Sequence, residues 1–140
     1  MLYVDTSILV AALTNEARTA EVQDWLAEQQ AGELSISDWV VTECSAALSM
    51  KLRTGQLQVA ERAEALAVFA EMVDASFHVL PVTGTDFRVA ARFADQHPLG
   101  LRAGDALHLA VAASRGVRIR ALDKSLVSAA EALGVSASVI

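Results

Sequence analysis

The stretch Leu2-Tyr3-Val4-Asp5-Thr6-Ser7 decides how the rest of the sequence is interpreted. Three apolar residues form a short strand-like run, and Asp5 then offers a carboxylate that can cap a helix over residues 8–13. An apolar strand that passes directly into a helix is the repeating unit of α/β proteins. The opening residues therefore favour an α/β fold.

The remainder of the chain continues this alternation. Apolar spacing and capping residues predict helices at residues 17–30, 38–53, 56–74, 84–93, 104–114 and 125–133, and strands at 34–37, 77–82, 118–122 and 135–140. This order implies an α/β/α sandwich, a mostly parallel sheet flanked by helices, with residues 38–74 as a protruding helical hairpin. Because no linker or repeat interrupts the chain, we expect one domain over residues 1–140.

Composition and charge exclude several classes of protein. With 54% hydrophobic and 20% charged residues, the chain is not intrinsically disordered. Its net charge of −6 argues against a general polyanion binder, although residues 1–80 hold 12 acids against 4 bases (−8) and residues 81–140 hold 5 against 7 (+2). A single cysteine, Cys44, excludes an internal disulfide. Without a secretory signal or an apolar run of about 18 residues, we expect a cytoplasmic protein with no membrane contact.

Four carboxylates stand where an α/β fold forms its ligand site. Asp5 and Asp123 each follow an apolar strand, at the carboxyl end where such sheets bind ligands. Glu43 lies within the apolar stripe of its helix, so its charge requires a cation, a proton or an arginine. Asp105 opens an almost wholly apolar helix, whose N-terminus we expect to be central. Taken singly, each aspartate is equally well explained as a helix cap, and Glu43 as half of a buried salt bridge.

Together, the four carboxylates predict a divalent-metal site. Clustered carboxylates repel one another and raise their own pKa values unless a cation neutralises them. Oxygen ligands select Mg²⁺ or Mn²⁺ over zinc or copper.

Four short motifs resemble, in order and spacing, those of the PIN-domain ribonucleases, and most closely the VapC-type toxins of bacterial toxin–antitoxin pairs. They are Tyr3-Val4-Asp5-Thr6-Ser7, Val41-Thr42-Glu43, Leu101-Arg102-Ala103-Gly104-Asp105-Ala106-Leu107-His108-Leu109-Ala110 and Ala121-Leu122-Asp123-Lys124. The resemblance covers nearly the whole chain and implies a PIN-like fold. It also implies which residues form the catalytic and metal-binding site, namely Asp5, Glu43, Asp105 and Asp123, with Thr6 or Ser7 assisting the metal or its water.

The resemblance further implies an activity and partners. The activity is that of a Mg²⁺- or Mn²⁺-dependent endoribonuclease that cuts single-stranded or looped RNA, such as a tRNA or rRNA loop, and leaves 5′-phosphate and 3′-hydroxyl ends. The partners are a second copy in a homodimer and a VapB-like antitoxin, for which we expect a groove along the hairpin near Trp25. Cationic side chains must guide RNA to an acidic site, and our candidates are Arg88, Arg92 and Arg102.

Two other classes of function fit parts of the pattern. A phosphoacceptor receiver domain is also a small acidic α/β unit, but it requires adjacent acids after its first strand, where this chain has Thr6-Ser7. A noncatalytic interaction module would use the acidic pocket only to receive an arginine from a partner. His108, one turn after Asp105, is expected to be a satisfied core histidine, and Trp25 and Trp39 are expected to pack in the core or an interface rather than at the crevice.

Overall fold

The first strand of the chain occupies the centre of a five-stranded parallel sheet. In the computed structural model, which describes residues 1–140, the strand order is β3-β2-β1-β4-β5. The strands are β1 (Leu2–Val4), β2 (Leu34–Ser37), β3 (Phe77–Leu80), β4 (Arg118–Ala121) and β5 (Ala137–Val139). Leu2 pairs with Leu34 on one side and with Arg118 on the other. The predicted α/β class is confirmed, and the sheet is entirely rather than mostly parallel.

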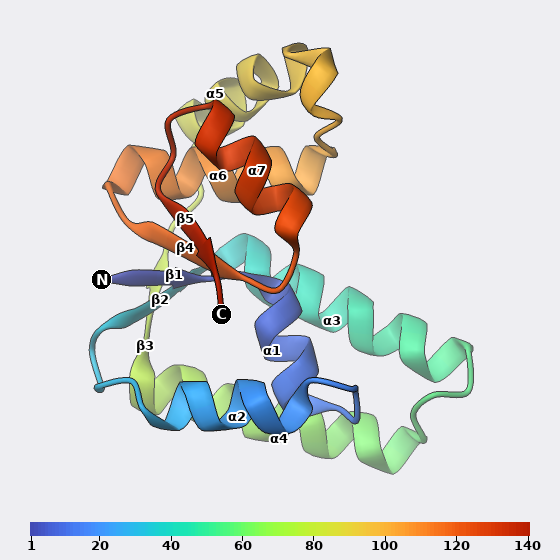
Figure 1. Ribbon diagram of the computed structural model, residues 1–140. Coiled ribbons are helices and arrows are strands. Elements are labelled where there is room, and N and C mark those ends of the chain that lie inside the picture. Colours follow the sequence, from blue (N-terminus) through green and yellow to red (C-terminus); the bar gives the residue numbers. More distant parts are fainter.

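Helices cover both faces of this sheet. They are α1 (Thr6–Leu13), α2 (Thr19–Ala27), α3 (Asp38–Arg53), α4 (Val59–Ser76), α5 (Gly84–Asp95), α6 (Ala103–Arg115) and α7 (Lys124–Ala132), with a 3₁₀ turn η1 (His97–Leu99). Figure 1 shows α5, α6 and α7 on one side of the sheet and α1, α2 and α4 on the other, with α3 and α4 extending past the sheet as the predicted hairpin. None of these helices combines the length and the apolar composition that a membrane span requires.

The core is built around β1 and α6. Tyr3 and Val4 of β1 are fully buried, as is Ile119 of the neighbouring β4. In α6 the seven consecutive residues 106–112 are all buried, because this helix packs beneath α5 and against α3 and β4. The sequence-based expectation that α6 is a central helix is therefore confirmed.

Two helices are shorter at their start than predicted. Helix α2 begins at Thr19, not at residue 17, because the hydroxyl of Thr19 accepts a hydrogen bond from the backbone of Glu16 and holds the preceding residues in a turn. Helix α4 begins at Val59 rather than residue 56, because Gln58 and Glu61 form a reciprocal capping box at that point.

A buried ion pair ties α5 to α6. Arg115 Nη1 lies 2.8 Å from both carboxylate oxygens of Asp86, whose side chain is 2% exposed. Asp86 also accepts hydrogen bonds from the backbone of Thr83 and the hydroxyl of Ser114, each at 2.9 Å. Burial opposes ionisation of Asp86, but the hydrogen bonds from Arg115, Thr83 and Ser114 outweigh it and hold its pKa below the ordinary value.

The strand order places a ligand crevice between β1 and β4. From β1 the chain continues to β2 and β3 on one side, and β4 and β5 lie on the other, so the direction of winding reverses at the β1–β4 pair. Ligands of open α/β sheets bind at such switch points, beyond the carboxyl ends of the strands. Asp5 and Asp123 follow these two strands. A receiver of the flavodoxin-like class has the order 2-1-3-4-5, so this topology excludes that alternative.

Candidate functional site

The four predicted carboxylates line one cavity. A hollow of about 490 Å³ at the carboxyl end of the sheet is bounded by Asp5, Thr6, Ser7, Glu43, Ala46, Ala47, Met50, Arg53, Asp105, His108, Asp123 and Leu126. A second hollow shares Glu43, Asp105 and Asp123 with it. The structure therefore brings together residues from the ends of β1 and β4, the middle of α3 and the first turn of α6.

Asp5 is held by Ser7, which was predicted together with Thr6 as a residue that assists the metal or its water. As the N-cap of α1, its Oδ2 accepts hydrogen bonds from the backbone nitrogen of Ser7 at 3.1 Å and from the Ser7 hydroxyl at 2.6 Å. The Ser7 Oγ in turn accepts from the backbone nitrogen of Leu122 at 3.3 Å. Ser7 thus links the end of β1 to the end of β4 and fixes Asp5 between them.

Glu43 is anchored through one oxygen only. Its Oε1 accepts hydrogen bonds from Thr6 Oγ1 at 2.6 Å and from His108 Nε2 at 2.5 Å. Burial disfavours the charged carboxylate, but the hydrogen bond and the charge of His108, together with the hydrogen bond from Thr6, hold the pKa of Glu43 below its usual range. Oε1 is therefore occupied, and Oε2 is the oxygen left for another ligand.

The other two carboxylates lie in contrasting environments. Asp123 caps α7 by accepting from the backbone and hydroxyl of Ser125 at 2.8 and 2.6 Å, and the hydroxyl hydrogen bond is the main reason its pKa is lowered. Asp105 is half-buried, and its pKa is raised by burial and by repulsion from Asp5, Asp123 and Glu43. The expectation that mutual repulsion raises the pKa values of the cluster is correct for Asp105 and wrong for Glu43 and Asp123, because local donors stabilise those two anions.

The carboxylates do not yet converge as ligands of a single point. No three Asp, Glu, His or Cys side chains are close enough together to hold an ion in their present rotamers. Asp5, Glu43 and Asp123 are each turned toward a hydroxyl donor, namely Ser7, Thr6 and Ser125. Coordination of one cation by three or more of these carboxylates therefore requires some of the side chains to rotate within the cavity, whereas Glu43 can offer its second oxygen without leaving its donors.

His108 belongs to the site and not only to the core. It is buried and satisfied as predicted, but its partners are the candidate site residues: Nε2 bonds Glu43 and lies 3.5 Å from Asp5 Oδ1. Burial opposes its charge, yet the Glu43 hydrogen bond and the surrounding carboxylates outweigh that effect and raise the pKa of His108. Cys44 next to Glu43 is buried, which raises its pKa to about 12 and leaves no thiolate nucleophile at neutral pH.

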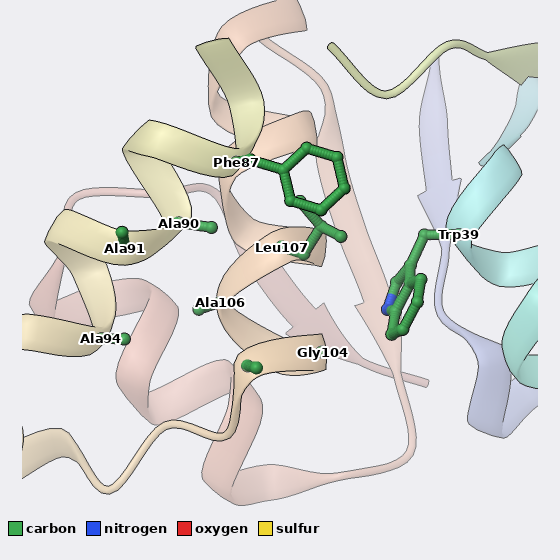
Figure 2. Close-up of a pocket in the computed structure, with 9 residues that line it drawn as sticks. Trp39, Phe87, Ala90, Ala91, Ala94, Gly104, Ala106 and Leu107 are labelled. Carbon is green, nitrogen blue, oxygen red and sulfur yellow. The ribbon is translucent and has the colours of Figure 1, made fainter. Parts of the chain in front are cut away.

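Trp39 corrects a second expectation. It lies at the crevice, because it lines the hollow that contains Glu43, Asp105 and Asp123. Its other face bounds an apolar pocket of about 260 Å³ between α3, α5 and α6. Figure 2 shows Phe87 from α5 and Trp39 from α3 on two sides of this pocket, with Gly104 and small side chains of α5 and α6 along its wall. Trp39 thus separates an apolar pocket from the acidic hollow.

The arginines are distributed differently from the prediction. Arg102 lines the hollow that it shares with Asp105 and Asp123, as expected of a rim residue. Arg88 and Arg92 are exposed on α5 and line neither acidic hollow. Arg53, at the end of α3, lines the hollow that contains all four carboxylates. Sequence analysis missed Arg53, since only the direction of α3 across the cavity reveals it.

Gly104 leaves space that the site needs. A Cβ built on Gly104 would lie 2.9 Å from Glu43 Oε2 and 3.3 Å from Trp39 Nε1. Because residue 104 is helical, Gly104→Ala should preserve or slightly raise thermal stability. It should also displace the Glu43 carboxylate, and for the metal-dependent activity expected from the sequence this should lower turnover about tenfold, since loss of a contact that orients a metal ligand costs 10–100-fold. The measurement is melting temperature together with turnover. Gly84→Ala, whose Cβ would make only an ordinary contact with Arg88, is the matched control and should leave turnover unchanged.

Comparisons with known proteins agree with this geometry. The family model described as PIN domain matches residues 2–132. Similar solved structures include VapC20 of Mycobacterium tuberculosis, a sarcin–ricin loop cleaving toxin, with 21% identity, a TM-score of 0.74, and a match that covers 92% of this chain and 95% of that chain. Another is FitAcB of Neisseria gonorrhoeae, with 19% identity, a TM-score of 0.72, and a match that covers 98% of this chain and 96% of that chain. A third is VapBC2 of Rickettsia felis, bound to a DNA fragment from its promoter, with 13% identity, a TM-score of 0.68, and a match that covers 100% of this chain and 99% of that chain. These three likenesses show the fold.

No curated protein matches the sequence. The family model spans all four carboxylates and both strands of the switch point. The chain therefore belongs to the PIN domain family of nucleases.

Proposed function

We propose that this protein is a Mg²⁺- or Mn²⁺-dependent ribonuclease that acts as the toxin of a toxin–antitoxin pair. The observation that carries the proposal is the single cavity that Asp5, Glu43, Asp105 and Asp123 line at the β1–β4 switch point. Four carboxylates there face one buried histidine and one arginine, Arg53, so the site carries excess negative charge. A divalent cation is the ligand that this donor set suits best, because all of the available donors are oxygens.

The residues of the cavity divide the work of hydrolysis. Asp5, Glu43, Asp105 and Asp123 would hold the cation, which when bound neutralises charge on a phosphodiester and acidifies water. Ser7 and Thr6 keep Asp5 and Glu43 in place. Asp105 accepts no side-chain hydrogen bond, so both of its oxygens are available to the cation or to the attacking water.

Surrounding residues favour RNA as the substrate. Arg53 and Arg102 lie at the edges of the acidic hollows, where they can contact phosphates on either side of the cut. The apolar pocket between Trp39 and Phe87 adjoins the site and can receive an unstacked base, which single-stranded or looped RNA presents (Figure 2). Arg88 and Arg92, exposed on the helix that carries Phe87, remain candidates for more distant phosphate contacts.

A VapB-like antitoxin is the proposed partner, alongside a second copy of the chain. VapBC2 of Rickettsia felis binds promoter DNA as a toxin–antitoxin assembly, and its fold is that of this chain. A groove of about 430 Å³ runs between α1, α2 and α4. Its apolar lining residues include Leu13, Leu57 and Val68, and its acidic lining residues are Glu61 and Glu64. It adjoins the hairpin expected to receive the antitoxin, and it suits an amphipathic helix with basic residues.

Purified protein incubated with structured RNA tests the proposal. With Mg²⁺ or Mn²⁺, we expect endonucleolytic products with 5′-phosphate ends, read on a sequencing gel by susceptibility to a 5′-phosphate-dependent exonuclease. A chelator should reduce cleavage to background, and excess Mn²⁺ should restore it. Absence of cleavage with every RNA, combined with binding of an arginine-containing peptide in the cavity, would instead support the noncatalytic interaction module.

A further inference from the structure

A continuous chain of buried polar side chains runs beneath the acidic cavity. The Tyr3 hydroxyl lies 2.7 Å from Ser37 Oγ and 2.7 Å from His108 Nδ1. On its other side the His108 ring bonds Glu43 through Nε2. Tyr3 and Ser37 are fully buried and His108 is 1% exposed, so no water competes for these contacts.

This chain connects three of the elements that carry carboxylates. Tyr3 lies in β1 two residues before Asp5, and His108 lies in α6 one turn after Asp105. Ser37 caps the N-terminus of α3, the helix that carries Glu43, by accepting from the backbone of Val40. Only the junction between β4 and α7, where Asp123 has its own donor in Ser125, contributes no residue to this chain.

The hydrogen-bond directions converge on Glu43. When the Tyr3 hydroxyl donates to Nδ1, the proton of the neutral imidazole resides on Nε2 and is donated to Glu43 Oε1. In the doubly protonated ring Nε2 is again the donor. In both forms the second oxygen, Oε2, lies on the side kept open by Gly104, where its neighbouring donor is Trp39 Nε1, which is buried and has no hydrogen-bond partner.

We infer that His108, held in orientation by Tyr3, is a positioning residue that presents Glu43 to a divalent cation. This inference rests on the proposed metal-dependent function. Carboxylates and histidines that surround a metal site are oriented by outer hydrogen bonds, whose loss costs 10–100-fold in metal affinity or activity. Tyr3 and His108 contact neither substrate nor cation in this scheme and act only through Glu43.

Mn²⁺ binding to the full chain, measured by isothermal titration calorimetry in the absence of RNA, tests this role. The dissociation constant should rise about 10–100-fold in His108→Leu and about tenfold in Tyr3→Phe, which removes a single oxygen atom. His108→Gln places an amide donor near the former Nε2 and should recover most of the lost affinity. Ser114→Ala removes a hydrogen bond of the Asp86 network and should leave Mn²⁺ affinity unchanged.

The possible outcomes separate the inference from the function on which it rests. Circular dichroism checks that each variant is folded, and Tyr3→Phe, which keeps the packed ring, decides the question if His108→Leu does not fold. Wild-type affinity in folded Tyr3→Phe, or in folded His108→Leu, overturns the positioning role alone. A wild-type chain that binds no Mn²⁺ overturns the proposed metal site, and this inference with it.

Discussion

Asp5→Asn is expected to reduce RNA cleavage by at least about 100-fold with little effect on folding. Loss of a group that only orients a metal ligand already lowers activity or metal affinity 10–100-fold, and Asp5 is proposed as a ligand itself. The side chain is 9% exposed in the cavity, and its Oδ1 lies 3.5 Å from His108 Nε2. Asparagine is nearly as good an N-cap as aspartate, because its amide oxygen can accept the bonds that Ser7 donates to Oδ2 of Asp5. The change therefore removes a negative charge from the cavity and little else.

The effect on cleavage is measured as the initial rate on a fluorescent RNA at saturating Mg²⁺. The effect on folding is measured as the melting temperature. Asp24→Asn, on the exposed side of α2, is the matched control, because it removes the same charge far from the cavity and should cleave at the wild-type rate. Cleavage by Asp5→Asn at the wild-type rate would remove Asp5 from the proposed site.

Arg115→Ala is expected to destabilise the fold by about 3 kcal/mol near neutral pH, at the lower end of the cost of breaking a buried ion pair, because Arg115 is itself partly exposed. It would leave the buried Asp86 carboxylate without its main partner. The folded-state pKa of Asp86 is depressed, so the stability that its ionisation contributes is present above its unfolded pKa and is lost as the pH falls through the folded value. The difference between wild type and variant should therefore shrink as the pH falls from 7 to about 3.

Urea denaturation at several pH values checks this prediction. Arg92→Ala, an exposed arginine of α5, should change the free energy of unfolding by no more than about 0.5 kcal/mol. If Arg115→Ala has the same free energy of unfolding as Arg92→Ala, the ion pair between Arg115 and Asp86 does not stabilise the packing of α5 against α6.

The sequence alone was sufficient to predict the elements and the four carboxylates. Asp5 and Asp123 could be placed because a strand ends one residue before Asp5 and two residues before Asp123, and the carboxyl ends of parallel strands lie together. Glu43 and Asp105 could be placed because a carboxylate in an apolar stripe and a polar start to an apolar helix are both unusual.

The contacts beneath the site could not be predicted, because they join residues that are far apart in the chain. His108 meets Tyr3 across 105 positions and Glu43 across 65, so no spacing rule connects them. Trp39 was within reach, since it precedes Glu43 by four residues and therefore lies on the same face of α3. Whether an exposed arginine such as Arg53 or Arg88 faces the cavity depends on how its helix is rotated about its axis. The distribution of charges along the sequence gives no information on that rotation.

The pairing of β1 with β4 also has a consequence during translation. It joins Leu2 to Arg118, so this seam of the sheet cannot close while the ribosome is still making the middle of the chain. Contacts of such high sequence separation form late and slowly. A nascent chain that ends before residue 118 lacks β4 and Asp123, and with them one wall of the acidic cavity, so the proposed cleavage of RNA cannot begin until this part of the chain has been made and has paired with β1.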